Sequence, residues 1–332
     1  MKNYNDFIGN VTEYLERRFP EAAVSFETVR KNNGITKQGV RLFKEGDHLS
    51  SVLYLESFYQ DYKEGKCLRD VLEDIGSYLE SYQVITNVNM SFFKDFEKVK
   101  SNIVPKLINA ELNQGLLEEV PHFKILDLAV VFCYYFDEKS ELGRDGRPFK
   151  KVGMASLLIK NEHMLLWGKT LEDLTNLNNW LEQPFEPILL NMMEFVFGSI
   201  YGTPYPNLLT TNEPLKTLYV EGDEVAPAFY ILSNKMRLWG ATCILNKDLL
   251  MQIAKRMNTS LYIIPSSINE VIIVPVSPVS SENVSDLVEM VKEVNRCELA
   301  PTEVLSDSIY FFNKDIGELT ICDKPIFDVI AM

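Results

Sequence analysis

The chain has 332 residues, of which 46% are hydrophobic and 24% charged, a composition typical of a globular protein rather than a disordered or fibrous one. At this length we expect about two domains, with a core that needs neither disulfides nor metals. The 33 basic and 47 acidic side chains give a net charge of −14. Because binding to phosphates depends on Lys and Arg, this balance disfavours nucleic acids and anionic membranes as partners.

The charge is unevenly distributed along the chain. Residues 1–150 carry 20 basic and 24 acidic side chains, whereas residues 151–332 carry 13 and 23. The acidic excess therefore lies mainly in the second half.

Cysteine usage and the absence of targeting segments predict a cytoplasmic protein. The cysteines are odd in number, far apart and without a Cys-x-x-Cys pair, which disfavours a disulfide framework or a zinc site: Cys67, Cys133, Cys243, Cys297 and Cys322. The first residues, Met1–Asp6, lack the apolar core of a secretory signal. The longest apolar run, 128–136, is shorter than the roughly 20 residues that span a bilayer.

The N-terminal third predicts a helix, a hairpin and two further helices. Apolar residues recur at helical spacing from Phe7 to Leu15, and Phe19-Pro20 ends that helix. Alternating residues at 24–28 and 40–43 flank Lys31-Asn-Asn-Gly34, and because Asn and Gly tolerate positive φ, they predict a β-hairpin. Helical spacing returns over 52–82, with a break near Gly65.

The middle of the chain predicts a buried strand, a loop and a capped helix. The apolar run 128–136 is typical of a strand covered on both faces. The polar, aperiodic segment 138–151 predicts an exposed loop. A strand is expected at 155–159, and Thr170-Leu-Glu-Asp173 is a capping box that opens a helix to about Trp180.

The last third predicts the order β-α-β-β-α-β-β. The expected strands and helices are 228–232, 247–257, 261–264, 271–274, 284–294, 309–312 and 319–322. Strands joined only by residues 265–269 should pair antiparallel. We therefore predict an α+β fold with mixed, largely antiparallel sheets packed with helices and two subdomains, 1–140 and 152–332, joined by a linker at 141–151.

Motifs for phosphate binding and for common hydrolases are missing. The chain has neither Gly-x-Gly-x-x-Gly nor Gly-x-x-x-x-Gly-Lys-Ser/Thr, and it lacks Gly-x-Ser-x-Gly and His-Glu-x-x-His. We therefore expect no cofactor and no metal. Of the three histidines, His122 stands five residues before Asp127, so the two side chains could converge where a loop enters the buried strand. A structural role for both is the alternative.

Two local sequences are candidates for binding. Between two apolar strands, a tight turn presents Ser266, Ser267, Asn269 and Glu270, which could hold a ligand, although Ser and Asn also cap turns. The aromatic stripe that contains Tyr54 and Tyr59 could line a pocket, but its spacing is also that of a helix packed on a sheet.

Several of these strings together resemble a known family. They are Lys31-Asn-Asn-Gly34, Tyr54-Leu-Glu-Ser-Phe-Tyr59 with Tyr62 and Gly65, Val120-Pro-His122, Leu126-Asp-Leu128 and Pro265-Ser-Ser-Ile-Asn-Glu270. The resemblance is to an uncharacterised bacterial family, domain of unknown function 5688, and it covers nearly the whole chain. It implies a cytoplasmic bacterial protein without an assigned activity. The resemblance also implies a histidine where Asn269 stands, and because Asn does not exchange protons at neutral pH, this substitution favours a structural or binding role for the turn.

Two functional hypotheses from different classes follow. The missing catalytic motifs, scarce histidine and acidic balance favour a non-enzymatic binding or interaction protein, with a protein or a small molecule as its partner. The alternative is a hydrolase or metal-assisted enzyme that uses Glu270, Asp127 and His122, which would then have to meet in one cleft. A component of a toxin–antitoxin or phage-defence system is a third class, which rests on analogy.

Overall fold

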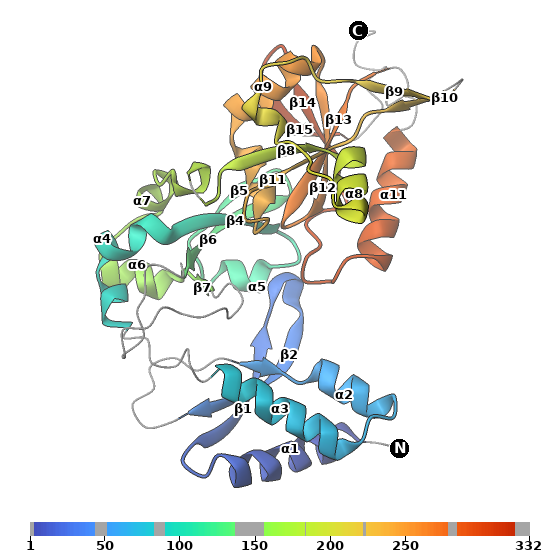
Figure 1. Ribbon diagram of the computed structural model, residues 1–332. Coiled ribbons are helices and arrows are strands. Elements are labelled where there is room, and N and C mark those ends of the chain that lie inside the picture. The colour runs from blue at the N-terminus through green and yellow to red at the C-terminus, as the bar shows by residue number, and fades with distance from the viewer. Residues whose placement is uncertain are drawn as a thin grey trace. The chain divides into compact units, whose positions relative to one another are not determined.

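The chain folds into two compact units (Figure 1). The computed structural model describes residues 3–43, 52–82, 90–136, 156–182, 184–221, 224–277 and 284–322. The N-terminal unit consists of Met1–Asn102 and Tyr134–Leu157, and the C-terminal unit of Ile103–Cys133 and Leu158–Met332. The predicted linker at 141–151 lies outside the described residues, so the division into 1–140 and 152–332 stays a prediction.

The N-terminal unit begins with the predicted helix and hairpin. Helix α1, Tyr4–Arg18, is capped by the Asn3 side chain and buries Phe7, Val11 and Leu15. Strands β1, Ala23–Arg30, and β2, Thr36–Phe43, pair antiparallel. The connection η1, Asn32–Gly34, has positive φ at Asn33 and Gly34, as the Asn-Gly sequence predicts.

Two helices cover this small sheet. They are α2, Glu56–Lys63, and α3, Leu68–Tyr82. The prediction of helix from residue 52 is wrong at its start, because Leu53–Tyr54 forms strand β3, which pairs with β2 through Gly39 and Val40. The core joins α1, the sheet and α3 through Val11, Val40 and Ile75, among others. The unit continues with η3, Met90–Lys94, α4, Phe96–Val99, and η4, Lys100–Asn102.

A four-stranded sheet opens the C-terminal unit. It contains β4, Ile103–Asn109, β5, Phe123–Ile125, β6, Leu128–Tyr135, and β7, Ser156–Leu158, with the short helix α5, Gln114–Leu117, after β4. All eight residues of β6 are buried, which confirms the predicted buried strand. The last two residues of β6, Tyr134 and Tyr135, and the first two of β7, Ser156 and Leu157, belong to the N-terminal unit, so the chain passes from one unit to the other within these two strands.

A six-stranded antiparallel sheet forms the centre of the C-terminal unit. Its order is β15-β14-β12-β13-β11-β8. The strands are β8, Pro187–Asn191, β11, Tyr230–Asn234, β12, Leu261–Ser267, β13, Glu270–Pro275, β14, Tyr310–Asn313, and β15, Glu318–Ile321. The pairing of β12 with β13 confirms the predicted antiparallel hairpin. Strands β9, Leu218–Glu221, and β10, Glu224–Pro227, form a separate hairpin.

Helices α8, Met192–Tyr201, and α11, Val284–Cys297, lie on the same face of this sheet (Figure 1). Phe195 of α8 packs on Leu190 and Ile231, and Leu287 of α11 packs on Tyr262, whose side chains share one face by strand register. The remaining helical elements are α6, Asn161–Trp167, α7, Leu171–Thr175, η5, Asn179–Leu181, η6, Leu208–Thr210, η7, Gly240–Leu245, and α9, Lys247–Met257.

The α+β class is therefore confirmed. A second predicted helix boundary, the end of the helix that begins after Thr170, is wrong. The capping box at Thr170 and Asp173 forms as predicted, but α7 ends at Thr175 instead of near Trp180. The segment that follows is rich in Asn, which favours caps and turns over helix interiors. Among the described residues, no helix combines the length and the apolar character that crossing a bilayer requires.

The five cysteines are free thiols. Cys133 and Cys243 are buried. Burial raises the pKa of Cys133 to about 11 and the pKa of Cys243 to about 12. Both thiols therefore stay protonated at neutral pH and act as small apolar side chains.

Candidate functional site

The predicted polar turn is shorter and more enclosed than its sequence indicates. Strands β12 and β13 extend to Ser267 and from Glu270, so only Ile268 and Asn269 remain in the turn. Ser266 and Glu270 are half-buried, while Ser267 is buried. The turn therefore presents few of its polar groups to solvent.

Asn269 connects this turn to the end of β11 and the loop that follows it through hydrogen bonds. Its backbone carbonyl accepts a hydrogen bond from Ser233 Oγ at 2.7 Å, and its Oδ1 accepts one from the Trp239 N–H at 3.1 Å. Its own N–H donates to Ser267 Oγ at 3.1 Å. These contacts are structural, and the one from the Trp239 N–H uses the side-chain amide oxygen, an atom that a histidine side chain lacks.

The loop that Asn269 holds has strained backbone. Arg237 and Trp239 have φ values of 51° and 54°, a region that side chains with a Cβ rarely adopt. The Asn234 side chain spans the loop, since it donates to the carbonyl of Leu238 at 2.8 Å and accepts from the N–H of Leu238. Gly240 is required, because a Cβ there would lie 2.5 Å from the Asn269 carbonyl oxygen.

Two side chains of opposite charge, Glu270 and Arg237, interact electrostatically beside this loop. Burial raises the pKa of Glu270, and the positive charge of Arg237 partly opposes that shift. The Arg237 guanidinium lies over the Phe195 ring, 4.3 Å from its centroid. Within the described part of the chain, Arg237 Nη2 is buried without a hydrogen-bond partner. A strained loop next to a perturbed carboxyl group is typical of functional sites, although structural roles also produce it.

Asp127 is held in a cluster of hydroxyl groups. Its Oδ2 accepts hydrogen bonds from Ser306 Oγ at 2.5 Å and Ser308 Oγ at 2.9 Å, and its Oδ1 accepts one from Tyr310 Oη at 2.7 Å. Burial, followed by the nearby Asp127 carboxylate, raises the pKa of Tyr310. Because three hydroxyl donors occupy the carboxylate, it is poorly placed to accept a substrate proton.

The sequence analysis missed the three partners of Asp127. They lie about 180 positions away in sequence, as their separations of 179, 181 and 183 residues show. One signal was available, because Ser306, Ser308 and Tyr310 alternate with Asp307 and Ile309 and therefore share one face of extended chain. That pattern alone does not indicate the partner.

The three proposed catalytic residues have separate partners. His122 Nδ1 lies 3.0 Å from the Val120 carbonyl oxygen. Across the residues that the structure describes, no hydrogen bond or ion pair joins His122, Asp127 and Glu270 to one another, and no group of three His, Cys, Asp or Glu side chains is arranged to hold a metal. A catalytic role for these residues stays a prediction.

The two tyrosines of the aromatic stripe have different surroundings. Tyr59 lies among Tyr4 and Phe7, with ring centroids 4.8 and 5.3 Å away, and packs against the N-terminal core. Tyr54 lines a pocket of about 420 Å³ at the edge strand β3, and Lys31 Nζ lies 4.3 Å from its ring centroid. Of the two tyrosines, Tyr54 is the one that lines a described pocket.

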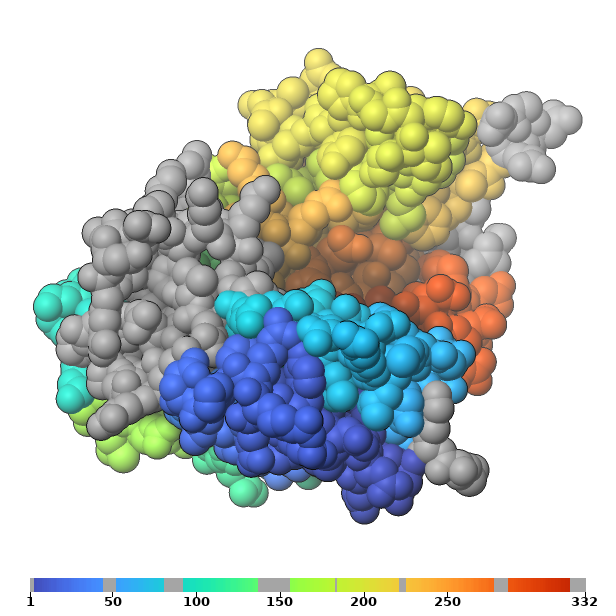
Figure 2. Space-filling model, turned by 60° about the horizontal axis from the view of Figure 1, so that its bottom comes forward, coloured from blue at the N-terminus to red at the C-terminus, as the bar shows by residue number. Residues whose placement is uncertain are grey.

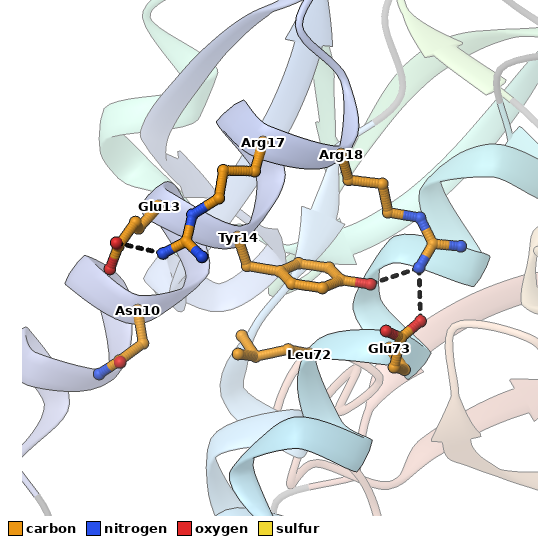
Figure 3. Close-up of a pocket in the computed structure, with 7 residues that line it drawn as sticks. All are labelled: Asn10, Glu13, Tyr14, Arg17, Arg18, Leu72 and Glu73. Carbon is orange, nitrogen blue, oxygen red and sulfur yellow. Dashed lines mark hydrogen bonds and ion pairs between the residues drawn. The ribbon is translucent and has the colours of Figure 1, made fainter.

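A second pocket, of about 490 Å³, lies between α1 and α3 (Figure 3). Arg18 reaches across it, and its guanidinium donates to Tyr14 Oη, to Glu73 at 2.6 Å and to both Glu80 oxygens at 3.1 Å. A Cβ at Gly76 would lie 2.9 Å from Arg18 Nη1, so the absence of a side chain there makes room for the guanidinium. Because its donors are already engaged, Arg18 acts as a clamp between two helices.

Comparison with known proteins gives a family without an assigned activity. Residues 4–314 match a family described as "Family of unknown function (DUF5688)". The chain belongs to this family. The resemblance inferred from the sequence strings is thereby confirmed. No curated protein and no solved structure matches the chain.

One further feature of this DUF5688 member is an apolar helix surface turned to solvent. Five side chains form the outer face of α8, and they expose 48, 44, 49, 66 and 72% of their surfaces: Met193, Val196, Phe197, Ile200 and Tyr201. Figure 2 shows this helix, in yellow-green, at the molecular surface. Phe195, on the opposite side of α8, packs against the sheet and lies beneath Arg237.

Proposed function

We propose that this chain is a non-enzymatic binding protein that holds a partner protein on the outer face of α8. The observation that carries the proposal is the arrangement of that helix. A helix that is apolar on all sides is normally enclosed. Among the described residues, however, α8 packs on its own unit through the side that carries Phe195 and Gly198.

The composition of this face is typical of protein interfaces. Interface cores are enriched in aromatic residues and Met and are depleted of charge. The outer face contains Phe197, Tyr201 and Met193, and the single charged residue of α8 is Glu194. Contiguous exposed apolar surface of this kind marks interaction sites in soluble proteins.

Charge favours a basic partner. Residues 151–332 carry 13 basic and 23 acidic side chains, and α8 contains neither Lys nor Arg. Helices that lie on anionic membranes carry Lys and Arg on their polar side, so a lipid surface is a poor match. A second copy of the chain has the same negative charge, whereas an apolar segment flanked by Lys or Arg complements it.

Binding of a model helix tests this proposal. The probes are two synthetic amphipathic helices, one of Leu and Lys and one of Leu and Glu, titrated into the full chain by fluorescence anisotropy. The variant Phe197→Ser/Ile200→Ser removes two large apolar side chains from the outer face of α8. The matched control is Leu165→Ser/Leu166→Ser on α6, where two leucines expose 83 and 55% of their surfaces.

We expect the Leu-Lys helix to bind the wild type and the α6 control equally, and the α8 variant about tenfold more weakly or worse, a difference of about 1.4 kcal/mol. The Leu-Glu helix should bind more weakly than the Leu-Lys helix. Equal affinity for the α8 variant and the wild type would contradict the proposal. Sedimentation that shows a dimer in the wild type, but not in the α8 variant, would assign the face to a second copy and overturn the choice of a basic partner.

A further inference from the structure

The pocket at Tyr54 is a candidate site for a small molecule, because of its size and the residues that line it. It has a volume of about 420 Å³, within the range of small-molecule sites. Side chains of β2, β3, α2 and α3 line it, among them Lys37, Tyr54, Ser57, Phe58 and Tyr78. Every one of these residues belongs to the N-terminal unit, so the site is independent of α8.

Aromatic rings form much of the wall. The Phe58 and Tyr78 rings meet edge to face, with their centroids 5.7 Å apart. Tyr78 exposes 50% of its surface, although an aromatic side chain usually gains stability from burial. Rings that are ordered but incompletely covered offer faces on which a planar ligand can stack.

Two lysines lie against the third ring. Lys31 Nζ is 4.3 Å and Lys37 Nζ is 5.6 Å from the centroid of Tyr54. Both ammonium groups therefore adjoin the same ring, and like charges at neighbouring positions repel. Among the residues that the structure describes, no carboxylate lies within ion-pair distance of either.

This arrangement is unusual in an acidic chain. With 47 acidic against 33 basic side chains, carboxylates are available to pair with surface lysines, and Lys66 pairs with both Asp61 and Asp74 in the same unit. Lys37 instead lines the aromatic pocket and Lys31 lies against the ring of Tyr54, so two positive charges adjoin one aromatic side chain of the pocket. An anion placed between them would relieve their repulsion.

We propose that this pocket binds a small molecule in which a planar ring carries an anionic group. The ring stacks among Tyr54, Phe58 and Tyr78, and the anionic group lies at Lys31 and Lys37. The hydroxyl of Ser57, which is exposed at the pocket, supplies a further hydrogen-bonding group. This ligand site is separate from the outer face of α8, and its proposal does not depend on the role proposed for that helix.

Calorimetric titration of the full chain with 1-naphthyl phosphate tests the site. Separate titrations with 1-naphthol and with inorganic phosphate measure the contribution of each half of the ligand. The variant Lys31→Gln/Lys37→Gln removes both charges and keeps polar side chains of similar size. The matched control is Lys63→Gln, because Lys63 Nζ lies 5.2 Å from the Tyr59 ring centroid outside the pocket.

We expect 1-naphthyl phosphate to bind about tenfold more tightly than either half alone. Affinity should fall about tenfold in the double variant and stay unchanged in the Lys63→Gln control. Raising the salt concentration should weaken binding to the wild type, a measurement that needs no variant. Absence of binding, or equal affinity in the double variant, would overturn the proposal. Tighter binding of a single-stranded oligonucleotide would replace the small molecule by a nucleic acid.

Discussion

Helices α8 and α9 belong to the same unit and have similar lengths, but they differ in how far their apolar side chains are buried. Helix α9 buries Leu249, Leu250, Ile253 and Met257, and Lys255 is among the residues that it leaves to solvent. In helix α8 Gly198 is the buried residue, Phe195 is half-buried, and five large apolar side chains are exposed. The same residue types therefore stabilise the fold in one helix and remain available for contacts in the other.

The difference also appears in how each helix is encoded. In α9 the apolar residues recur at helical spacing on one face. Charged residues stand at both ends of the helix, at Lys247, Asp248, Lys255 and Arg256. In α8 they occur on every face, so periodicity does not indicate which side is buried. A helix of the second kind needs contacts from outside its own fold to be fully covered.

Truncating one isoleucine in each helix should separate the two roles. Ile253 is completely buried and Ile200 exposes 66% of its surface. We expect Ile253→Ala to lower the free energy of unfolding by about 2–5 kcal/mol, because it leaves a cavity. Ile200→Ala should change it by less than about 0.5 kcal/mol. Urea denaturation measures both, and similar losses in the two variants would contradict the comparison.

The polar interior of the same unit should show a smaller effect. Asp127→Asn replaces an acceptor by an amide donor that faces hydroxyl groups of Ser306, Ser308 or Tyr310. We expect a loss of about 1–3 kcal/mol in the free energy of unfolding. Asp315→Asn, at an exposed position, is the control and should be neutral. A neutral result at Asp127 would show that the hydroxyl cluster contributes little to stability.

The smallest expected effect concerns the dependence of stability on pH. Burial raises the pKa of Glu270 in the folded chain, so the folded state holds this proton more tightly than the unfolded state. The contribution of Glu270 to stability is therefore present at low pH and is lost as pH rises through its raised pKa. We expect Glu270→Gln to unfold at a slightly higher temperature than the wild type at pH 7, with no difference at acidic pH.

Thermal unfolding at several pH values measures this prediction. Glu318→Gln, at an exposed position of β15, is the control. An increase in stability that is the same at every pH would show that the carboxyl group of Glu270 is not the cause.

The elements that were predicted correctly are those with local signals. Helix α9 has one apolar face, the β1–β2 connection has Asn33 and Gly34 where positive φ is needed, and β6 is an uninterrupted apolar run. Strand β8 and helix α8 were not predicted, because the segment 187–201 is mostly apolar and lacks a distinct period. Strand β3 has two residues and depends on pairing with β2.

The candidate sites were harder to predict because their partners are distant in sequence. Asn269 was chosen for its turn, but its role depends on Ser233 and Trp239. Tyr54 was chosen as an aromatic residue, and only the sheet places Lys31 and Lys37 against its ring. Local sequence identifies such a residue, whereas tertiary packing decides what it contacts.

The clamp between α1 and α3 carries a consequence for the evolution of the family. Arg18 crosses α3 at Gly76, the position where a Cβ would lie 2.9 Å from its guanidinium. A larger residue at position 76 therefore requires a shorter one at position 18, and Glu73 and Glu80 then lose their common partner. Among family members these four positions should vary as a group, so a sequence that retains glycine at 76 is expected to retain the arginine and both carboxylates.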